Sequence, residues 1–189
     1  GTEPTAGYDK ESYYESLDDD YTLREDDGAR SLFSKVVTQH VTAIINVPVM
    51  KDHGIAGVTL CLKNLAFGAV NNTQRFHPTP YFCDPASAEI CAHPVLSGKV
   101  RLHIVDALQA CFDGGPAGMK TWTMWNEERL FFGTDPVAID RIGLEIIDKK
   151  RKENNYPSVF QKARHIATAE KKGLGIYDRK NIELVELNV

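Results

Sequence analysis

A nearly continuous apolar run from Val41 to Val49 is the feature that most restricts what this chain can fold into. The run is rich in β-branched residues, which is typical of a strand buried in a parallel or mixed sheet. Pro48 lies where such a strand is expected to end. A second segment, Val100 to Val105, alternates and then becomes apolar, so it predicts another central strand that ends at Asp106.

Segments with helical periodicity alternate with these strands. Helices are expected over Ala29–Gln39, over Ile55–Phe67 with a start near Gly57, from Asp84-Pro85 onward, over Val137 to about Glu153, and over Ser158–Lys172. Further short elements are a helix or turn at Ala107–Phe112 and strands at Leu130–Phe132 and Ile182–Leu187. The alternation predicts an α/β fold, with a mostly parallel or mixed central sheet sandwiched by helices.

The charge of the chain is distributed unevenly. Residues 1–30 hold ten acidic and three basic residues, and the rest of the chain holds 16 acids and 19 bases. We therefore expect an acidic N-terminal arm over residues 1–28 and a single α/β domain over residues 29–189. The weak positive excess of the domain falls far short of a nucleic-acid surface and suits a small anionic molecule as partner.

The sequence leaves the compartment of the protein open. No apolar run approaches the roughly 18 residues of a membrane span. The chain opens at Gly1 without methionine, and its first residues do not read as an export signal. The expectation is a soluble protein, cytoplasmic or exported with its signal removed.

The four cysteines, Cys61, Cys83, Cys91 and Cys111, form no C-x-x-C pair. This spacing encodes neither a ferredoxin-type iron–sulfur cluster nor a zinc ribbon. Cys61 and Cys111 lie in apolar segments and are expected in the core. Cys83 and Cys91 flank an expected helix start and are expected to be partly exposed, so that a disulfide could form in an oxidising compartment.

The strongest functional signal follows the first strand, where Lys51, Asp52 and His53 precede Gly54 and Gly57. Titratable groups between apolar segments are costly unless they have partners or a ligand. A helix that begins near Gly57 would offer its N-terminus to an anion, with charge from Lys51 and Lys63. The alternative is structural: Gly57 permits a turn, Thr59 caps the helix and Lys63 is solvated.

Acidic residues at the other expected strand ends could complete a site, because ligands of α/β sheets collect beyond the carboxyl ends of the strands. Asp106 ends the second strand, and Asp135 and Asp140 lie at the start of the long helix. The side chains of suitable type for a divalent metal are those of His53, His77, Asp84, Asp106 and Asp135. Helix capping is the structural alternative for Asp84 and Asp135, which both precede proline.

Four blocks of the sequence resemble the DUF362 family, in the same order. They read NVPVMKDHGIAGVTLCLKNLAFG, HPTPYFCDPASAEI, VRLHIVDALQACFDGGP and GTDPVAIDRIG, and they lie between about Val41 and Lys150. The family is largely uncharacterised. The resemblance implies that many relatives are longer, that some are fused to ferredoxin-type iron–sulfur modules, and that others carry twin-arginine export signals. Family-like polar positions include Lys51, His53, Thr59, Lys63, Asn64, His77, Asp84, Asp106, Asp135 and Asp140.

Two functions remain open at this point. The first is a small-molecule enzyme with an anion or metal site at the strand ends. Its candidate catalytic residues are Lys51, His53, Asp106 and Asp135, its ligand-binding candidates are Thr59, Lys63, Asn64 and Asp140, and its metal candidates are His53, His77, Asp84 and Asp106. The second is a non-catalytic or redox-accessory module that works with an iron–sulfur partner protein.

Overall fold

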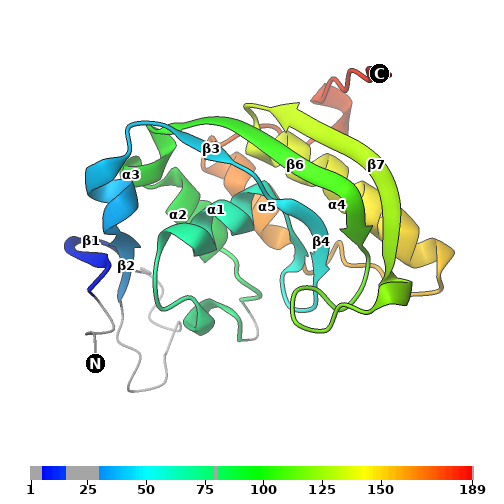
Figure 1. The fold of residues 1–189 in the computed structure, drawn as a ribbon, viewed down its shortest axis with the longest axis horizontal. Coiled ribbons are helices and arrows are strands. Elements are labelled where there is room, and N and C mark those ends of the chain that lie inside the picture. Colours follow the sequence, from blue (N-terminus) through cyan, green and yellow to red (C-terminus); the bar gives the residue numbers. More distant parts are fainter. Residues whose placement is uncertain (1–5, 16–29, 79–80, 189) are drawn as a thin grey trace.

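The computed structural model of the protein describes residues 6–15, 30–78 and 81–188. Strand β6 (Val100–Cys111) is the centre of a mixed five-stranded sheet (Figure 1). On one side of β6, β3 (Ile44–Asn46) and β4 (Val49–His53) run parallel to it, and β5 (Gly57–Thr59) pairs antiparallel with β4. On the other side, β7 (Met124–Gly133) is antiparallel. The α/β fold with a mixed central sheet is therefore confirmed.

The first apolar run forms two short strands in line, β3 and β4, which are interrupted at Val47 and Pro48, so the first strand ends at the proline as expected but a second one follows it. β3 pairs with the first half of β6, and β4 continues along the second half as far as Lys51, which pairs with Cys111. The chain stays in the sheet across the break because the Pro48 carbonyl accepts a hydrogen bond from the Asp106 amide at 2.8 Å. Pro48 thus costs the sheet one donor without ending it.

The segment after His53 turns back as a hairpin and does not begin a helix. β5 brings Gly57 opposite His53 and Thr59 opposite Lys51. Helix α1 (Cys61–Ala69) starts only after Leu60, so the expected helix start near Gly57 and the capping role of Thr59 are both wrong. Gly57 has φ +82°, and a Cβ there would lie 2.9 Å from the Ala163 nitrogen. The position therefore requires glycine for both its backbone angle and its packing.

The second predicted strand is longer than expected, and this moves Asp106 away from a strand end. β6 continues to Cys111, so the expected helix or turn over Ala107–Phe112 is wrong for most of its length. Asp106 lies in mid-strand, opposite Leu130 of β7 and Val49 of β4. The expected strand at Leu130–Phe132 is part of the ten-residue β7.

The main helices, α1, α2 (Ala86–Ala92), α4 (Pro136–Glu153) and α5 (Arg164–Lys171), lie on one face of the sheet (Figure 1). The core forms between this helical layer and the buried side chains of the strands, such as Met50 and Val105. Apolar side chains elsewhere on the strands are exposed, namely Ile45, Leu108, Leu130 and Phe132, as is Val47 between β3 and β4. The long helix predicted from Val137 is confirmed as α4, and α5 is shorter than the helix expected over Ser158–Lys172.

The N-terminal segment adds a small second sheet. β1 (Tyr8–Glu15) pairs antiparallel with β2 (Arg30–Ser34), which is followed by a π-helical turn, η1 (Val36–His40). The expected helix over Ala29–Gln39 is therefore wrong for its first half. Tyr14 is buried against Phe76, and its hydroxyl donates to the Glu89 carboxylate at 2.6 Å. Most of the expected acidic arm lies outside the described residues, so the division into arm and domain stays a prediction.

The remaining short helical elements are η2 (Gln74–Phe76), α3 (Pro94–Ser97), η3 (Thr121–Thr123) and η4 (Arg179–Asn181). The expected strand at Ile182–Leu187 is wrong, because these residues have no regular secondary structure. All four cysteines are buried thiols, so the expected exposure of Cys83 and Cys91 is also wrong. Among the described residues, no helix is both long and apolar enough to cross a membrane.

A buried carboxylate joins the two central helices. Asp140 of α4 is fully buried, and its two oxygens accept hydrogen bonds from the Cys61 and Leu62 amides at 2.6 and 3.0 Å. These are the first two amides of α1, which have no acceptor within the helix. Asp140 therefore serves α1 as a cap supplied by another helix, and the N-cap position itself can be the apolar Leu60.

Replacing this cap should destabilise the fold. Asp140→Ala leaves both amides without an acceptor in a buried place, and we expect the free energy of unfolding to fall by about 2 kcal/mol at pH 7. Urea denaturation measures this loss. Glu153→Ala, which removes an exposed acid of the same helix, is the matched control and should cost no more than a few tenths of a kcal/mol. Equal losses in both variants would contradict the capping role.

Candidate functional site

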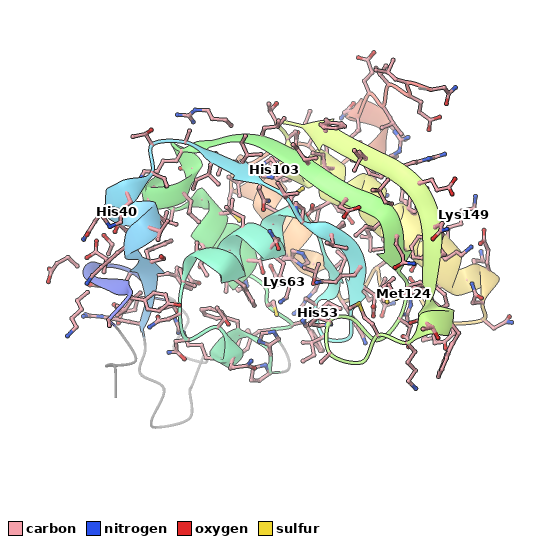
Figure 2. The ribbon with its side chains drawn as sticks, viewed as in Figure 1. His40, His53, Lys63, His103, Met124 and Lys149 are labelled. Atoms are coloured by element: carbon pink, nitrogen blue, oxygen red, sulfur yellow. The ribbon has the colours of Figure 1, made fainter. Side chains whose placement is uncertain are left out.

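Four titratable side chains from separate segments gather near the end of β4, and we call them the His–Lys cluster: His53, Lys63, His77 and His165. His53 ends β4, Lys63 lies in the first turn of α1, His77 follows η2, and His165 lies in the first turn of α5. Figure 2 shows His53 and Lys63 close to each other and far from His40 and Lys149. The cluster is assembled by tertiary packing between elements distant in sequence.

The hairpin after β4 fixes the imidazole of His53. The chain reverses immediately, so the Ile55 and Ala56 amides donate to His53 Nδ1 at 3.2 and 3.0 Å. An amide N–H can only donate, so Nδ1 carries a lone pair, and the proton of the neutral ring is on Nε2. The hairpin itself is held by Lys162, whose ammonium donates to the Gly54 carbonyl at 2.7 Å.

His77 is fixed in the opposite tautomer. Its Nδ1 lies 3.1 Å from the Thr73 carbonyl oxygen, which can only accept, so Nδ1 carries the proton and Nε2 the lone pair. The ring centroid lies 5.4 Å from that of His53 and 5.5 Å from that of Phe67, whose ring meets it edge-on. Neither Nε2 atom has a hydrogen-bond partner among the described residues.

Lys63 brings a positive charge into this apolar surrounding. Its side chain is 6 % exposed, and Nζ lies 4.0 Å from the centroid of the Phe67 ring, one helical turn further on. Within the described part of the chain, no carboxylate forms an ion pair with it. Burial, the largest cause, and repulsion by Lys51 together lower the pKa of Lys63 to about 8, although Cys83 opposes the change. A buried lysine without an acid is costly, and such places are candidates for function.

His165 is the most deeply buried member of the cluster. It is fully excluded from solvent, and neither of its ring nitrogens has a hydrogen-bond partner among the described residues. Burial and the charge of Lys63 lower the pKa of His165 to about 3, and burial with the neighbouring Lys63 also lowers the pKa of His53 to about 3. The histidines are therefore neutral hydrogen-bonding groups at pH 7, beside one ammonium.

The loop beside the cluster is held in an unfavourable backbone conformation. Phe82 and Cys83 have φ angles of 54° and 66°, a region that side-chain-bearing residues rarely adopt. Such strain costs about 1–3 kcal/mol per residue and is found most often at functional sites. It places the buried Cys83 thiol near Lys63, where burial raises the pKa of the thiol to about 11 and the ammonium opposes the rise.

Several residues predicted for the site belong to other networks. Asn64 donates to Asn46, which in turn bonds the Cys61 carbonyl and His103 Nδ1. Thr59 lies in β5, opposite the half-buried Lys51. The charge of Lys51 lowers the pKa values of His53 and Lys63. Of the predicted ligand-binding residues, Lys63 is therefore the one in the cluster. Lys51, predicted as a catalytic residue, lies at the edge of the cluster.

The acidic candidates do not join the cluster. Asp135 caps α4 through the Ala138 amide at 2.8 Å and also accepts from Ile176, as its structural alternative predicted. Asp106 accepts from the Leu108 amide, and Asp84 lies 4.0 Å from Arg164 and does not cap α2. Asp140 is the cap of α1, where burial raises its pKa to about 7 against the opposing effect of the two amides.

The metal site predicted from His53, His77, Asp84 and Asp106 is not assembled. Within residues 6–15, 30–78 and 81–188, no three His, Cys, Asp or Glu side chains are placed so that they could hold a metal ion. Two of the four predicted ligands, His53 and His77, do meet, and the acids that would complete the set lie in other contacts.

Sequence reasoning missed two buried groups. His165 is followed by the buried Ile166, and a histidine on the apolar side of a short helix is a weak signal. Arg151 belongs to the basic run from Lys149 to Lys152, a pattern typical of a solvated helix end, but it is buried and donates to Phe112, Asp113 and Pro157. It also lies 3.8 Å from the buried Asp52, which accepts from the Gly115 amide at 2.7 Å. Arg151, through Asp113 and Asp52, thus connects the end of α4 to the loop after β6.

The neutral histidines should make the fold sensitive to acid. Unfolded histidines bind a proton below about pH 6.5, whereas folded His53 and His165 do so only near pH 3. The unfolded state thus binds more protons between these values, and stability falls as the pH falls, by about 2 kcal/mol per histidine at pH 5. In urea denaturation at pH 7 and 5, His165→Gln should reduce this loss by about that amount.

The matched control is His40→Gln, which changes an exposed histidine of η1. It should leave the loss of stability between pH 7 and 5 unchanged, because its side chain is in water in both states. The raised pKa of Asp140 acts in the opposite direction over this range, so the difference between variants is the relevant quantity. A loss that is the same in His165→Gln and in the parent protein would contradict the buried neutral state of His165.

The comparisons with known proteins support the resemblance noted in the sequence. A family model described as "Domain of unknown function (DUF362)" matches residues 17–145, which is more than half of the chain. No curated protein and no solved structure matches the chain. The match spans β2 to the middle of α4, including three of the four members of the His–Lys cluster, His53, Lys63 and His77. The chain belongs to the DUF362 family.

Proposed function

We propose that this protein binds a small oxyanion, such as a carboxylate or a phosphate, at the His–Lys cluster. One observation carries the proposal: Lys63 is buried beside three neutral imidazoles, and no acid pairs with it among the described residues. Removing an ammonium from water without a counterion is unfavourable. A bound anion would supply the missing negative charge.

The neighbouring groups suit an anion that is held by hydrogen bonds. His53 offers an N–H from Nε2, and Lys63 offers three N–H donors. The half-buried Lys51 adds positive charge at the edge of the cluster. Charge-assisted hydrogen bonds of this kind are roughly twice as strong as neutral ones, and more so where water is excluded.

Lys63 could also transfer protons. A lysine with a pKa of about 8 can both give and take a proton near neutral pH. The acids Asp106 and Asp135, predicted as catalytic residues, have no part in this proposal because each has a structural contact elsewhere. Acid–base chemistry on a bound anion would therefore rest on Lys63, with His53 and His77 as neutral hydrogen-bonding neighbours.

A binding experiment with a matched pair of variants tests the proposal. Isothermal titration at pH 7 with acetate, glycolate, phosphate and sulfate should detect binding of at least one anion. Lys63→Met keeps the length and apolar stem of the side chain and should weaken that binding tenfold or more. Lys149→Met, an exposed lysine of α4 far from the cluster in Figure 2, should leave it unchanged.

Thermal unfolding of the same variants separates a binding role from a structural one. Lys63→Met should not be less stable than the parent protein, because it removes an unpaired buried charge. If none of the anions binds, or if Lys63→Met binds as well as the parent, the proposal fails. The first result would favour the alternative of a non-catalytic module that works with an iron–sulfur partner protein.

Anion binding should weaken as the pH rises through about 8. Only the protonated ammonium of Lys63 attracts an anion, and its pKa in the unliganded protein is about 8. Lys51 lowers the pKa of Lys63 and Cys83 raises it. The charge of Lys63 in turn lowers the pKa values of His53, His77 and His165. Because a bound anion raises the lysine pKa, the affinity should fall about tenfold per pH unit above that value. Titrations at pH 7, 8, 9 and 10 measure the decrease. An affinity that does not change between pH 7 and pH 10 would contradict a role for the Lys63 charge.

A further inference from the structure

The two imidazoles at the cluster are fixed in opposite tautomers by the backbone. His53 receives two amide N–H groups at Nδ1 and therefore presents an N–H at Nε2. His77 donates from Nδ1 to the Thr73 carbonyl and therefore presents a lone pair at Nε2. The ring centroids are 5.4 Å apart, and we infer that a single small ligand between the rings meets both Nε2 atoms. It then meets one donor and one acceptor.

We propose that the ligand is an oxyanion with an adjacent hydroxyl group, so that its anionic oxygens accept from Lys63 and His53 while its hydroxyl donates to His77. This inference rests on the proposed function and narrows the class of ligand. Two chemical sources share the pattern: a 2-hydroxycarboxylate, and a phosphate that retains one P–OH. Acetate and sulfate are oxyanions that lack the hydroxyl donor.

Electrostatics gives the reason for this preference. The Nε2 lone pair of His77 would face the lone pairs of an anion oxygen if the ligand had no proton to offer, and two acceptors in contact repel each other. His77 cannot relieve the conflict by changing tautomer, because its Nδ1 would then lose the N–H that the Thr73 carbonyl accepts. Protonation of the ring is also disfavoured, since burial lowers its pKa and Lys63 adds repulsion.

The surrounding groups make the arrangement rigid. The edge-on contact with Phe67 fixes the plane of the His77 ring, and the same Phe67 ring lies 4.0 Å from Lys63 Nζ. His53 cannot turn its ring over without breaking its hydrogen bonds to Ile55 and Ala56. The donor and the acceptor are therefore held in place before a ligand arrives, which is the condition for discrimination between similar ligands.

Two matched pairs of probes test the inference at pH 7. Methoxyacetate replaces the hydroxyl proton of glycolate by a methyl group, and sulfate lacks the P–OH that phosphate retains at this pH. The probe with the hydroxyl should bind about tenfold more tightly in at least one pair, which is the usual effect of one hydrogen bond to a buried group. The pair that shows the preference identifies the carboxylate or the phosphate as the anion.

Variants of the two histidines connect the preference to its cause. His77→Phe removes the acceptor and should abolish the preference, whereas Lys63→Met should weaken both members of a pair alike. His77→Gln retains an acceptor oxygen and should keep part of the preference, and this variant also covers the case in which His77→Phe fails to fold. His40→Phe, an exposed histidine far from the cluster in Figure 2, is the control and should change neither value.

Nitrogen-15 NMR of the imidazoles reads the tautomers directly. We expect a protonated Nε2 in His53 and a protonated Nδ1 in His77, and the reverse in either ring would overturn the inference. The inference would also be overturned if anion binding depends on Lys63 but shows no preference for the hydroxyl-bearing probe in either pair. In that case the proposed function would stand. Failure of every anion to bind would instead refute the proposed function, and with it this inference.

Discussion

The carboxylate of Asp140 is the contact on which the arrangement of the helical layer depends. It lies in α4, yet it satisfies the first two amides of α1, so neither helix has a complete set of partners without the other. Lys63 follows two residues after the first capped amide, and its position under the strands is therefore set by a residue far along the chain. Because a buried carboxylate is unfavourable without donors, and buried amides are unfavourable without an acceptor, the pair is stable only when docked.

The packing of the helical layer against the sheet also determines the protonation states of the His–Lys cluster. His53, His77 and His165 are kept neutral by burial and by the charge of Lys63, so the low pKa values of the imidazoles and the unpaired ammonium have a common origin. This arrangement of buried, unpaired polar groups is unfavourable for the stability of the fold by itself. The strained backbone at Phe82 and Cys83 has the same character and lies in the same region. Protein sites that bind ligands commonly combine these properties.

The sequence predicted best what is encoded locally. The α/β class followed from the β-branched run and the helical periods, and Asp135-Pro136 marked the start of α4 because a cap is a contact between neighbours. It predicted poorly what depends on pairing at a distance. The chain returns to the sheet as β4 after Pro48 because β6 supplies partners, and Asp106 lies in mid-strand because β7 extends the ladder beside it. No local pattern distinguishes a strand end from a strand interior once the apolar residues run out.

The candidate site shows the same division. Lys51, His53 and Lys63 stand out in the sequence because they follow an apolar run, but His165 enters only through the packing of α5 against the hairpin at Gly57. The structural alternative for Lys63, a solvated side chain, is excluded by its burial, whereas the alternative for Asp135 holds. Whether a polar residue belongs to a cap or to a ligand site depends on which amides lie within reach, and that is a property of the fold.

The four buried thiols have a consequence for how the motions of this protein can be followed. Each is shielded from solvent, and burial raises the pKa of each above the ordinary value for cysteine, so the reactive thiolate is scarce in the folded state. Alkylating reagents therefore reach a thiol only when its surroundings open. Cys61 lies under the Asp140 cap and Cys83 in the strained loop, so the order in which the four react would rank the local openings of the native state without any engineered label.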